Sequence, residues 1–315
     1  MDLLIQNLVS PVVLAFVLGI LARLVRSDLE IPSAIYQALS IYLLLAIGLK
    51  GGVALSQTPP KELVGPILLT LVMGVLTPLS AFLLLRKLGK LGRTDAAATA
   101  AHYGSVSAVT FVAAIEAAKI AGVPASGYLP ALVAILEVPG IIVGLLLARQ
   151  SKANGVKSAL HEVLTGKSIF LMLGGLVIGA VCGAEKVSGV APFFIDPFKG
   201  VLCLFLLELG IVAASRFGDL VRAGWRLVIV GCILPAGHGS VATASAVAIG
   251  MSAGSAAVFG AMVASASYIA APAAVRIALP KASPGIYLTL ALGVTFPFNL
   301  AIGIPLFLKL AESVS

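Results

Sequence analysis

The chain has 315 residues, of which 60% are hydrophobic and only 11% are charged, and its formal net charge is +8. Soluble globular proteins carry about 25% charged residues, so this composition leaves too few charges to cover a water-facing surface. It excludes an aqueous enzyme, a nucleic-acid-binding protein and a disordered tail, and it predicts an all-α membrane protein with many spans.

Ten apolar stretches follow one another along the chain, separated by short polar connections. Uncharged runs such as 63–85 and 227–275 can hold helices of the roughly 20 residues that a bilayer requires. Asp2 and the lack of a basic residue before the first run argue against a removable signal peptide, so we expect that run to remain as a span. The predicted spans lie near residues 9–25, 33–49, 64–86, 97–119, 126–148, 168–184, 198–214, 225–248, 254–276 and 285–308.

The basic residues predict the orientation of these spans. Counted loop by loop, the 21 Lys and Arg residues divide 15 to 6 between the two sides of the membrane. Positive residues gather in cytoplasmic loops, so the richer side is the cytoplasmic one, and the net positive charge needs no acidic partner to explain it. We therefore expect a multi-pass protein of the cytoplasmic (inner) membrane with both termini on the non-cytoplasmic side.

Similar sequences recur in the two halves of the chain. AFVLGILA is matched by GLVIGAVC and LLLAIGLKGG by LFLLELGIVAA, so that Gly19 corresponds to Gly179 and Gly48 to Gly210. Since each half holds five spans, an odd number, the halves cross the membrane in opposite senses, as in many transporters. The predicted parts are a first five-helix inverted repeat at 1–148, a cytoplasmic linker at 149–167 and a second five-helix repeat at 168–315.

The fourth and ninth spans carry small hydroxyl residues where a helix is easily interrupted. In the repeat alignment the segment GSVS faces the segment ASAS. A broken helix leaves free backbone N–H groups and a positive dipole end in mid-membrane, where they suit a small anion, and nearby hydroxyls offer oxygens to Na⁺. The alternative is that these small residues only let helices pack closely. The predicted substrate-binding residues are Gly104, Ser105, Val106, Ser107, Ser265, Ala266 and Ser267.

Three carboxylates lie within the spans, and a charge inside a bilayer needs a partner or a function. Glu137 lies two residues before a proline, which frees a backbone carbonyl, so it is the candidate for cation coordination or for organising the core. Glu116 is expected to pair with Lys119, and Glu208 to pair with Lys50 across the repeat interface.

The other reactive side chains point to no catalytic centre. His102 and His238 have no second His, Cys or carboxylate at a ligand spacing, so hydrogen bonds between packed helices are expected. The three cysteines lie apart in apolar runs and predict neither a disulfide nor a metal site. No pattern fixes a hydrolytic arrangement of Ser105, His102 and Glu137, and no phosphate-binding GxxxxGK loop is present. We expect no enzyme, no cofactor and no metal other than Na⁺ as the coupling ion.

Six motifs in the same order make the chain similar to a known family. They are IPSAIYQALSIYLLLAIGLKGG, GSVSAVTF, LEVP, PAGHG, SYIAAPAAVRIALP and a closing ASPGIYL followed by FPFNLAIGIPLF. In these motifs, which extend over almost the whole chain, the sequence resembles the cyanobacterial-type sodium-dependent bicarbonate transporter family. The resemblance implies ten spans in two inverted repeats, a gate domain and a core domain that move relative to each other, a homotrimer, and Na⁺-coupled uptake of bicarbonate.

The resemblance also assigns roles to residues. Ser107 and Thr110 match the family's hydroxyls in the fourth span, and Ser265 and Ser267 match those in the ninth. Glu137 stands where cyanobacterial members carry an aspartate before the proline. The sodium-binding residues implied in this way are Ser107, Thr110, Glu137, Ser267 and Tyr268.

Departures from the family pattern bear on the substrate and on regulation. Tyr268 stands in the position of an aspartate, Ala266 replaces a serine, and Ala271 precedes Pro272 where the pattern has glycine. The lost carboxylate leaves the Na⁺ stoichiometry open, and it leaves open a carrier of another small anion, such as an organic carboxylate. The resemblance also implies a PII-like cytoplasmic regulator, but the linker 149–167 is much shorter than in cyanobacterial members. A membrane sensor that binds its ligand without transport is the alternative from a different class.

Overall fold

The computed structural model describes residues 9–148, 161, 164–219 and 224–314, and this part of the chain contains helices and connections but no strand. In the first half the helices are α2 (Pro11–Leu24), α3 (Ser33–Gln57), α4 (Pro60–Lys87), α5 (Arg93–Gly104), α6 (Ala108–Ile120) and α7 (Leu129–Leu146). In the second half they are α9 (Lys167–Ser188), α10 (Ala191–Phe194), α11 (Phe198–Ser215), α13 (Trp225–Ala248), α14 (Ala253–Val263) and α15 (Ala271–Ala278). The last helical segment is built from α16 (Pro284–Leu288), η1 (Thr289–Thr295), α17 (Phe296–Phe298), η2 (Asn299–Gly303) and α18 (Ile304–Val314).

Eight segments of the described chain are long and apolar enough to cross a membrane. One of them, Arg93–Ile120, joins α5 and α6, and another, Pro284–Val314, joins α16 to α18. The helices α2 and α14 are apolar but shorter. These segments confirm a multi-pass helical membrane protein, whereas the prediction of ten spans goes beyond the eight that meet this length.

The outer surface of the bundle is apolar, as a lipid-facing surface must be. On α9, the side chains of Phe170 and Val181 are 68% and 80% exposed. On α4, Leu68, Val72 and Leu83 are exposed, while the opposite side of the helix is buried against its neighbours. In water such a surface would cause aggregation, but in a bilayer it is the ordinary contact with lipid.

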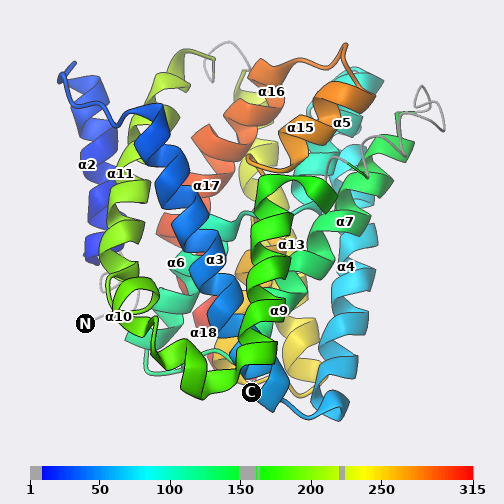
Figure 1. The fold of residues 1–315 in the computed structure, drawn as a ribbon. Coiled ribbons are helices and arrows are strands. Elements are labelled where there is room, and N and C mark those ends of the chain that lie inside the picture. Colours follow the sequence, from blue (N-terminus) through cyan, green and yellow to red (C-terminus); the bar gives the residue numbers. More distant parts are fainter. Residues whose placement is uncertain (1–8, 149–160, 162–163, 220–223, 315) are drawn as a thin grey trace.

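Two helix pairs cross at glycines. The helices α3 and α9 lie side by side, and α2 lies along α11 (Figure 1). A Cβ atom added to Gly48 would lie 2.9 Å from the Cα atom of Gly175, and one added to Gly210 would lie 3.0 Å from that of Gly19. The backbones therefore touch at both crossings, and a side chain at these positions would push the helices apart.

The remaining helices form two bundles of similar construction. In the first, α4, α5 and α7 pack against one another, and in the second, α13 packs against α14 and α18. The helix α6 runs from the first bundle to α14 and α18, and α15 runs from the second bundle to α5 and α7. Each interrupted span therefore links both bundles, and the two interruptions meet between them.

Candidate functional site

The fourth span is interrupted as the sequence predicts. The helix α5 ends at Gly104, and the backbones of Ser105 and Ser107 are extended, with φ of −102° and −92°. The helix α6 then begins at Ala108 with Ser107 as its N-cap, whose hydroxyl accepts a hydrogen bond from the Thr110 N–H at 3.2 Å. Gly104 itself lies against α7, where an added Cβ would be 2.8 Å from the Cα atom of Gly140.

The ninth span is interrupted over a longer segment. The helix α14 ends at Val263, and α15 begins at Ala271, with 264–270 outside both helices. The hydroxyl of Ser267 accepts from the N–H of Ala271 at 3.3 Å. The Ser267 hydroxyl thereby accepts a hydrogen bond from the first N–H group of α15. The Ser107 hydroxyl does the same for an N–H group in the first turn of α6.

The two interruptions bind each other directly. The backbone N–H of Ser107 donates to the hydroxyl of Ser265 at 2.8 Å, and that hydroxyl donates to the Met262 carbonyl at 2.7 Å. In the opposite direction, the N–H of Ser267 donates to the His102 carbonyl at 2.8 Å. Residues about half a chain apart are thus held together by reciprocal hydrogen bonds in the protein interior.

Glu137 faces this junction from α7. Its residue is only 4% exposed, and its carboxyl lies beside Ser105. A small cavity of about 10 Å³ lies next to it, shared with Ser107, Ser267 and Tyr268. That volume is about what one water or one small ion occupies, so the site holds room for little more than such a group in this conformation.

Several buried polar atoms around the junction have no hydrogen-bond partner among the described residues. An unpaired buried polar group costs about 1 to 3 kcal/mol, so a cluster of them is a favourable place for a polar ligand to bind. The unpaired atoms at the junction are His102 Nε2, Ser105 Oγ, Thr110 Oγ1, Tyr268 Oη and Asn299 Oδ1.

Asn299 is a site residue that the sequence analysis missed. Its side-chain N–H donates to the Ala264 carbonyl at 3.0 Å, at the C-terminal end of α14, while its Oδ1 stays unpaired. The sequence could have indicated this residue, because Asn299 is the only amide side chain in the uncharged run 282–308. A polar side chain in such a run is expensive unless it has a function.

The apolar members of the predicted set form the walls of the junction. Val106 lines the small cavity, and Ala266 is buried in the cluster that also contains Tyr103. Tyr268 is partly buried, and its ring meets Phe296 edge to face at 5.9 Å. The structure therefore brings the predicted substrate and sodium residues into one region, together with Asn299.

The expected hydrogen bond between packed helices is confirmed for His238, whereas His102 bonds to a carbonyl of its own helix, α5. His102 Nδ1 lies 2.7 Å from the Ala98 carbonyl, and its ring stacks on Tyr287 with centroids 4.3 Å apart. His238 Nε2 lies 2.7 Å from the Ser80 hydroxyl. Within the described residues, no group of three or more His, Cys, Asp and Glu side chains could hold a metal ion.

The expected partners of the other charged residues were wrong. Glu116 pairs with Lys199 of α11, at 2.6 Å, and not with Lys119 on its own helix. Lys50 lies over the ring of Phe198, 4.8 Å from the centroid, and forms no ion pair with Glu208 in the described structure. In both cases the neighbouring helix determines the contact, and the spacing of residues along the chain does not predict which helix that is.

The comparisons with known proteins bear on the whole chain. A family model described as the Na⁺-dependent bicarbonate transporter superfamily matches residues 11–312. Among curated proteins, none matches the chain significantly.

Proposed function

The chain belongs to the Na⁺-dependent bicarbonate transporter superfamily, as its motifs predict, and on this basis we propose that it takes up bicarbonate together with Na⁺ across the cytoplasmic membrane. Membership of a transporter superfamily also indicates that the protein is not an enzyme. The observation that carries the proposal is the junction of two interrupted spans, which bind each other and leave a cluster of buried polar atoms unpaired.

The anion is proposed to bind between the two interruptions. The helices α6 and α15 both begin there, so their N-terminal dipole ends favour a negative charge. The hydroxyls of Ser105, Ser107, Ser265 and Ser267 supply hydrogen-bonding groups at the same place. The residues Gly104, Val106 and Ala266 at the junction have small side chains. They support the proposal because they leave space only for a compact ligand.

Sodium is proposed to bind beside the anion, at Glu137. A carboxylate buried in the membrane interior needs a cation, and no basic side chain forms an ion pair with Glu137 in the described structure. The hydroxyls of Ser107, Thr110, Ser267 and Tyr268 are the other proposed ligands, and oxygen is the donor that hard cations prefer. To this set we add the unpaired Oδ1 of Asn299.

Helix packing supports two inverted five-helix repeats at 1–148 and 168–315. Gly52 meets the Leu176 carbonyl and the Ala180 nitrogen, as Gly210 meets the Phe16 carbonyl and the Ile20 nitrogen. These contacts are related if Gly19 corresponds to Gly179, as in the sequence alignment, and Gly210 corresponds to Gly52, one helical turn after Gly48. Most of the linker 149–167 lies outside the described residues.

The proposed mechanism is a relative movement of two helix groups. The pairs α2–α11 and α3–α9 form the proposed gate, and the two similar bundles with the interrupted spans form the proposed core. Movement of the core along the gate would expose the junction to each side in turn. Location in the inner membrane with both termini outside, assembly as a homotrimer and a PII-like regulator remain expectations from the sequence and the resemblance.

A carrier of a small organic carboxylate is the second candidate. The aromatic pair Tyr268 and Phe296 at the junction favours it, because an apolar wall suits a carbon substituent better than it suits bicarbonate. The small cavity of about 10 Å³ favours the smaller anion. The two substrates are distinguished by competition in the same uptake measurement.

The test is uptake of ¹⁴C-bicarbonate by proteoliposomes with and without an inward Na⁺ gradient. Alkaline buffer and short times limit leakage of CO₂ through the lipid, and empty liposomes give the background. We expect accumulation that disappears when choline replaces Na⁺. Na⁺-dependent uptake of acetate or pyruvate without uptake of bicarbonate would move the assignment to the second candidate. Saturable bicarbonate binding without accumulation would identify a sensor.

A further inference from the structure

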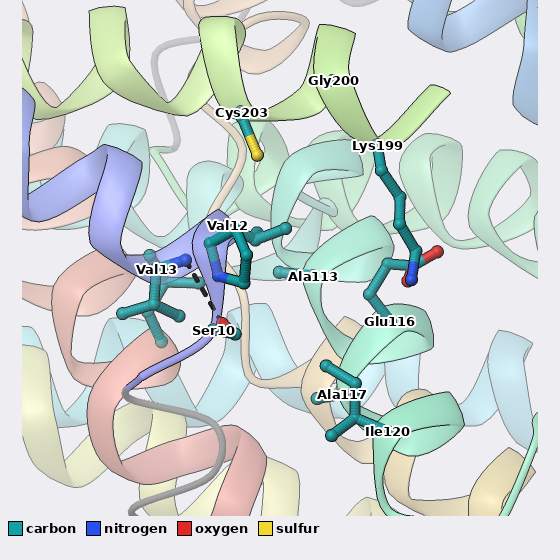
Figure 2. A pocket seen from close by; sticks show the side chains of 12 residues that line it. Ser10, Val12, Val13, Ala113, Glu116, Ala117, Ile120, Lys199, Gly200 and Cys203 are labelled. Carbon is teal, nitrogen blue, oxygen red and sulfur yellow. Dashed lines mark hydrogen bonds and ion pairs between the residues drawn. The ribbon is translucent and has the colours of Figure 1, made fainter. Parts of the chain in front are cut away.

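A second cavity, lined mainly by apolar residues, lies away from the junction, where α2, α6 and α11 meet. Its volume is about 300 Å³, far larger than that of the cavity at the junction. In Figure 2, the start of α2 at Ser10 and Val13 forms one wall, α6 a second and α11 a third. The function proposed above does not use this cavity.

The cavity contains an ion pair between two helices. The ammonium of Lys199 on α11 lies 2.6 Å from the carboxylate of Glu116 on α6, and the two side chains point toward each other in Figure 2. The Glu116 side chain is only 12% exposed, whereas that of Lys199 is 54% exposed. A largely buried carboxylate and an accessible ammonium therefore stand together at a cavity wide enough for small hydrated ions.

The surroundings of this pair are positively charged overall. Lys50 interacts electrostatically with Glu116, with Lys119 and with Asp196. Together with Lys199, three lysines and two carboxylates gather at this end of the bundle. Such an excess of positive charge around the Glu116–Lys199 pair attracts anions and raises their local concentration.

The helix α6 connects this cavity with the junction. Ala113 and Ala117 line the cavity, and Thr110 lies one turn before Ala113 on the same helix. From Glu116 back to Thr110 the helix rises about 9 Å. On the facing side, Leu300 lines the cavity directly after Asn299, whose amide belongs to the junction.

We propose that this cavity is an outer binding site that receives a small oxyanion on Lys199 and Na⁺ on Glu116 before both reach the junction. The inference rests on the proposed transport function and adds a second site to it. The anion replaces Glu116 as the counter-ion of Lys199, and Na⁺ replaces Lys199 as the counter-ion of Glu116, so the charge of the cavity stays balanced. The distribution of basic residues predicts that this end of the bundle faces the outside.

Uptake kinetics provide the first test. In Lys199→Gln, the KM for external bicarbonate should rise about fivefold with kcat unchanged, and in Glu116→Gln the Na⁺ concentration for half-maximal uptake should rise by a similar factor. Lys199→Arg keeps the charge and should behave like the wild type. Lys186→Gln, which removes an exposed lysine of α9 outside the cavity, is the matched control. A fall in kcat at unchanged KM would overturn the proposal and identify the pair as structural.

Cys203 provides a second test that needs no transport. It lies one turn after Lys199 on α11, lines the cavity and is a free thiol that points toward it in Figure 2. With Cys182 and Cys232 replaced by serine, the rate of labelling by a membrane-impermeant anionic methanethiosulfonate is measured on the solubilised protein. Bicarbonate with Na⁺ should slow the labelling at least about threefold, and Lys199→Gln should abolish the protection.

The two proposals fail in different ways. Na⁺-dependent uptake by a protein whose Cys203 is never protected would overturn the outer site and leave the transport function standing. Protection of Cys203 without any Na⁺-dependent uptake would contradict the transport function, while the anion site in the cavity would stand. A wild-type thermal unfolding midpoint of the Lys199→Gln variant in detergent would establish that the variant is folded.

Discussion

Tyr268 brings a buried hydroxyl to the junction without giving it a hydrogen-bond partner among the described residues. If the hydroxyl serves only the fold, Tyr268→Phe removes an unpaired polar atom and should raise the free energy of unfolding by up to about 1 kcal/mol. If it is a ligand of Na⁺, the same change should also raise the Na⁺ concentration for half-maximal uptake severalfold. We expect both effects, measured by thermal unfolding in detergent and by uptake. Unchanged Na⁺ dependence would remove Tyr268 from the sodium site.

Glu137 is the only carboxylate that the described structure places at the junction. We predict that Glu137→Gln raises the Na⁺ concentration for half-maximal uptake at least about tenfold, which corresponds to about 1.4 kcal/mol. The reason is that the amide keeps the shape and one oxygen but loses the charge that attracts the cation. Glu185→Gln, at an exposed position of α9, is the control and should leave uptake unchanged. Wild-type Na⁺ dependence in Glu137→Gln would contradict the proposed site.

The sequence alone could predict the kinds of residue at the junction but not all of their contacts. The hydroxyls at 105–107 and 265–267 and the carboxyl of Glu137 were predictable, because a polar group in an apolar run is costly unless it has a function. The bond from the Ser267 N–H to the His102 carbonyl was not, because it joins backbone atoms of two distant segments. The same reason explains why Glu116 was assigned to Lys119, its neighbour in sequence, and found with Lys199.

At the scale of helices, adjacent glycines of α9 serve as a matched pair. Gly175 touches the backbone of α3, while nothing lies within 4 Å of a Cβ atom at Gly174. We predict that Gly175→Leu separates α3 from α9 and lowers the free energy of unfolding by about 1 to 3 kcal/mol, because the crowded crossing cannot accept a side chain. Gly174→Leu should be tolerated, since its side chain enters lipid. Thermal unfolding of the two variants in detergent checks this, and equal stabilities would refute the close crossing.

Helix positions were far easier to predict than helix pairing. Long apolar runs bounded by Pro, Gly and charged residues place the helices to within a few residues, as the span predicted at 64–86 and the observed α4 illustrate. Pairing depends on which small residues face each other, and the similarity of the two halves matched Gly48 with Gly210. The contacts favour Gly52, one turn away, because successive glycines of α3 look alike in sequence but differ in which backbone atoms they touch.

At the scale of the whole molecule, coupling requires that the two ions stabilise the same arrangement of the bundles. The interrupted spans contact both bundles, and their hydrogen bonds to each other pass through the proposed anion site. An anion alone would bring an unbalanced charge next to Glu137, whereas Na⁺ alone would leave the dipole ends of α6 and α15 unsatisfied. The occluded state is therefore most stable when both ions are bound. Under this condition the core moves only when it carries both ions or neither ion.

This argument predicts a reciprocal linkage that binding measurements can test. If Na⁺ strengthens bicarbonate binding by a factor of about ten, bicarbonate must strengthen Na⁺ binding by the same factor, because the two routes to the doubly bound protein have equal free energy. Ligand-dependent shifts in Tm, collected over a grid of both concentrations, give the two factors. In Glu137→Gln both factors should fall toward one together, since the variant removes the charge that joins the sites. A bicarbonate affinity that does not depend on Na⁺ in the wild type would mean that coupling arises from the movement itself and not from binding.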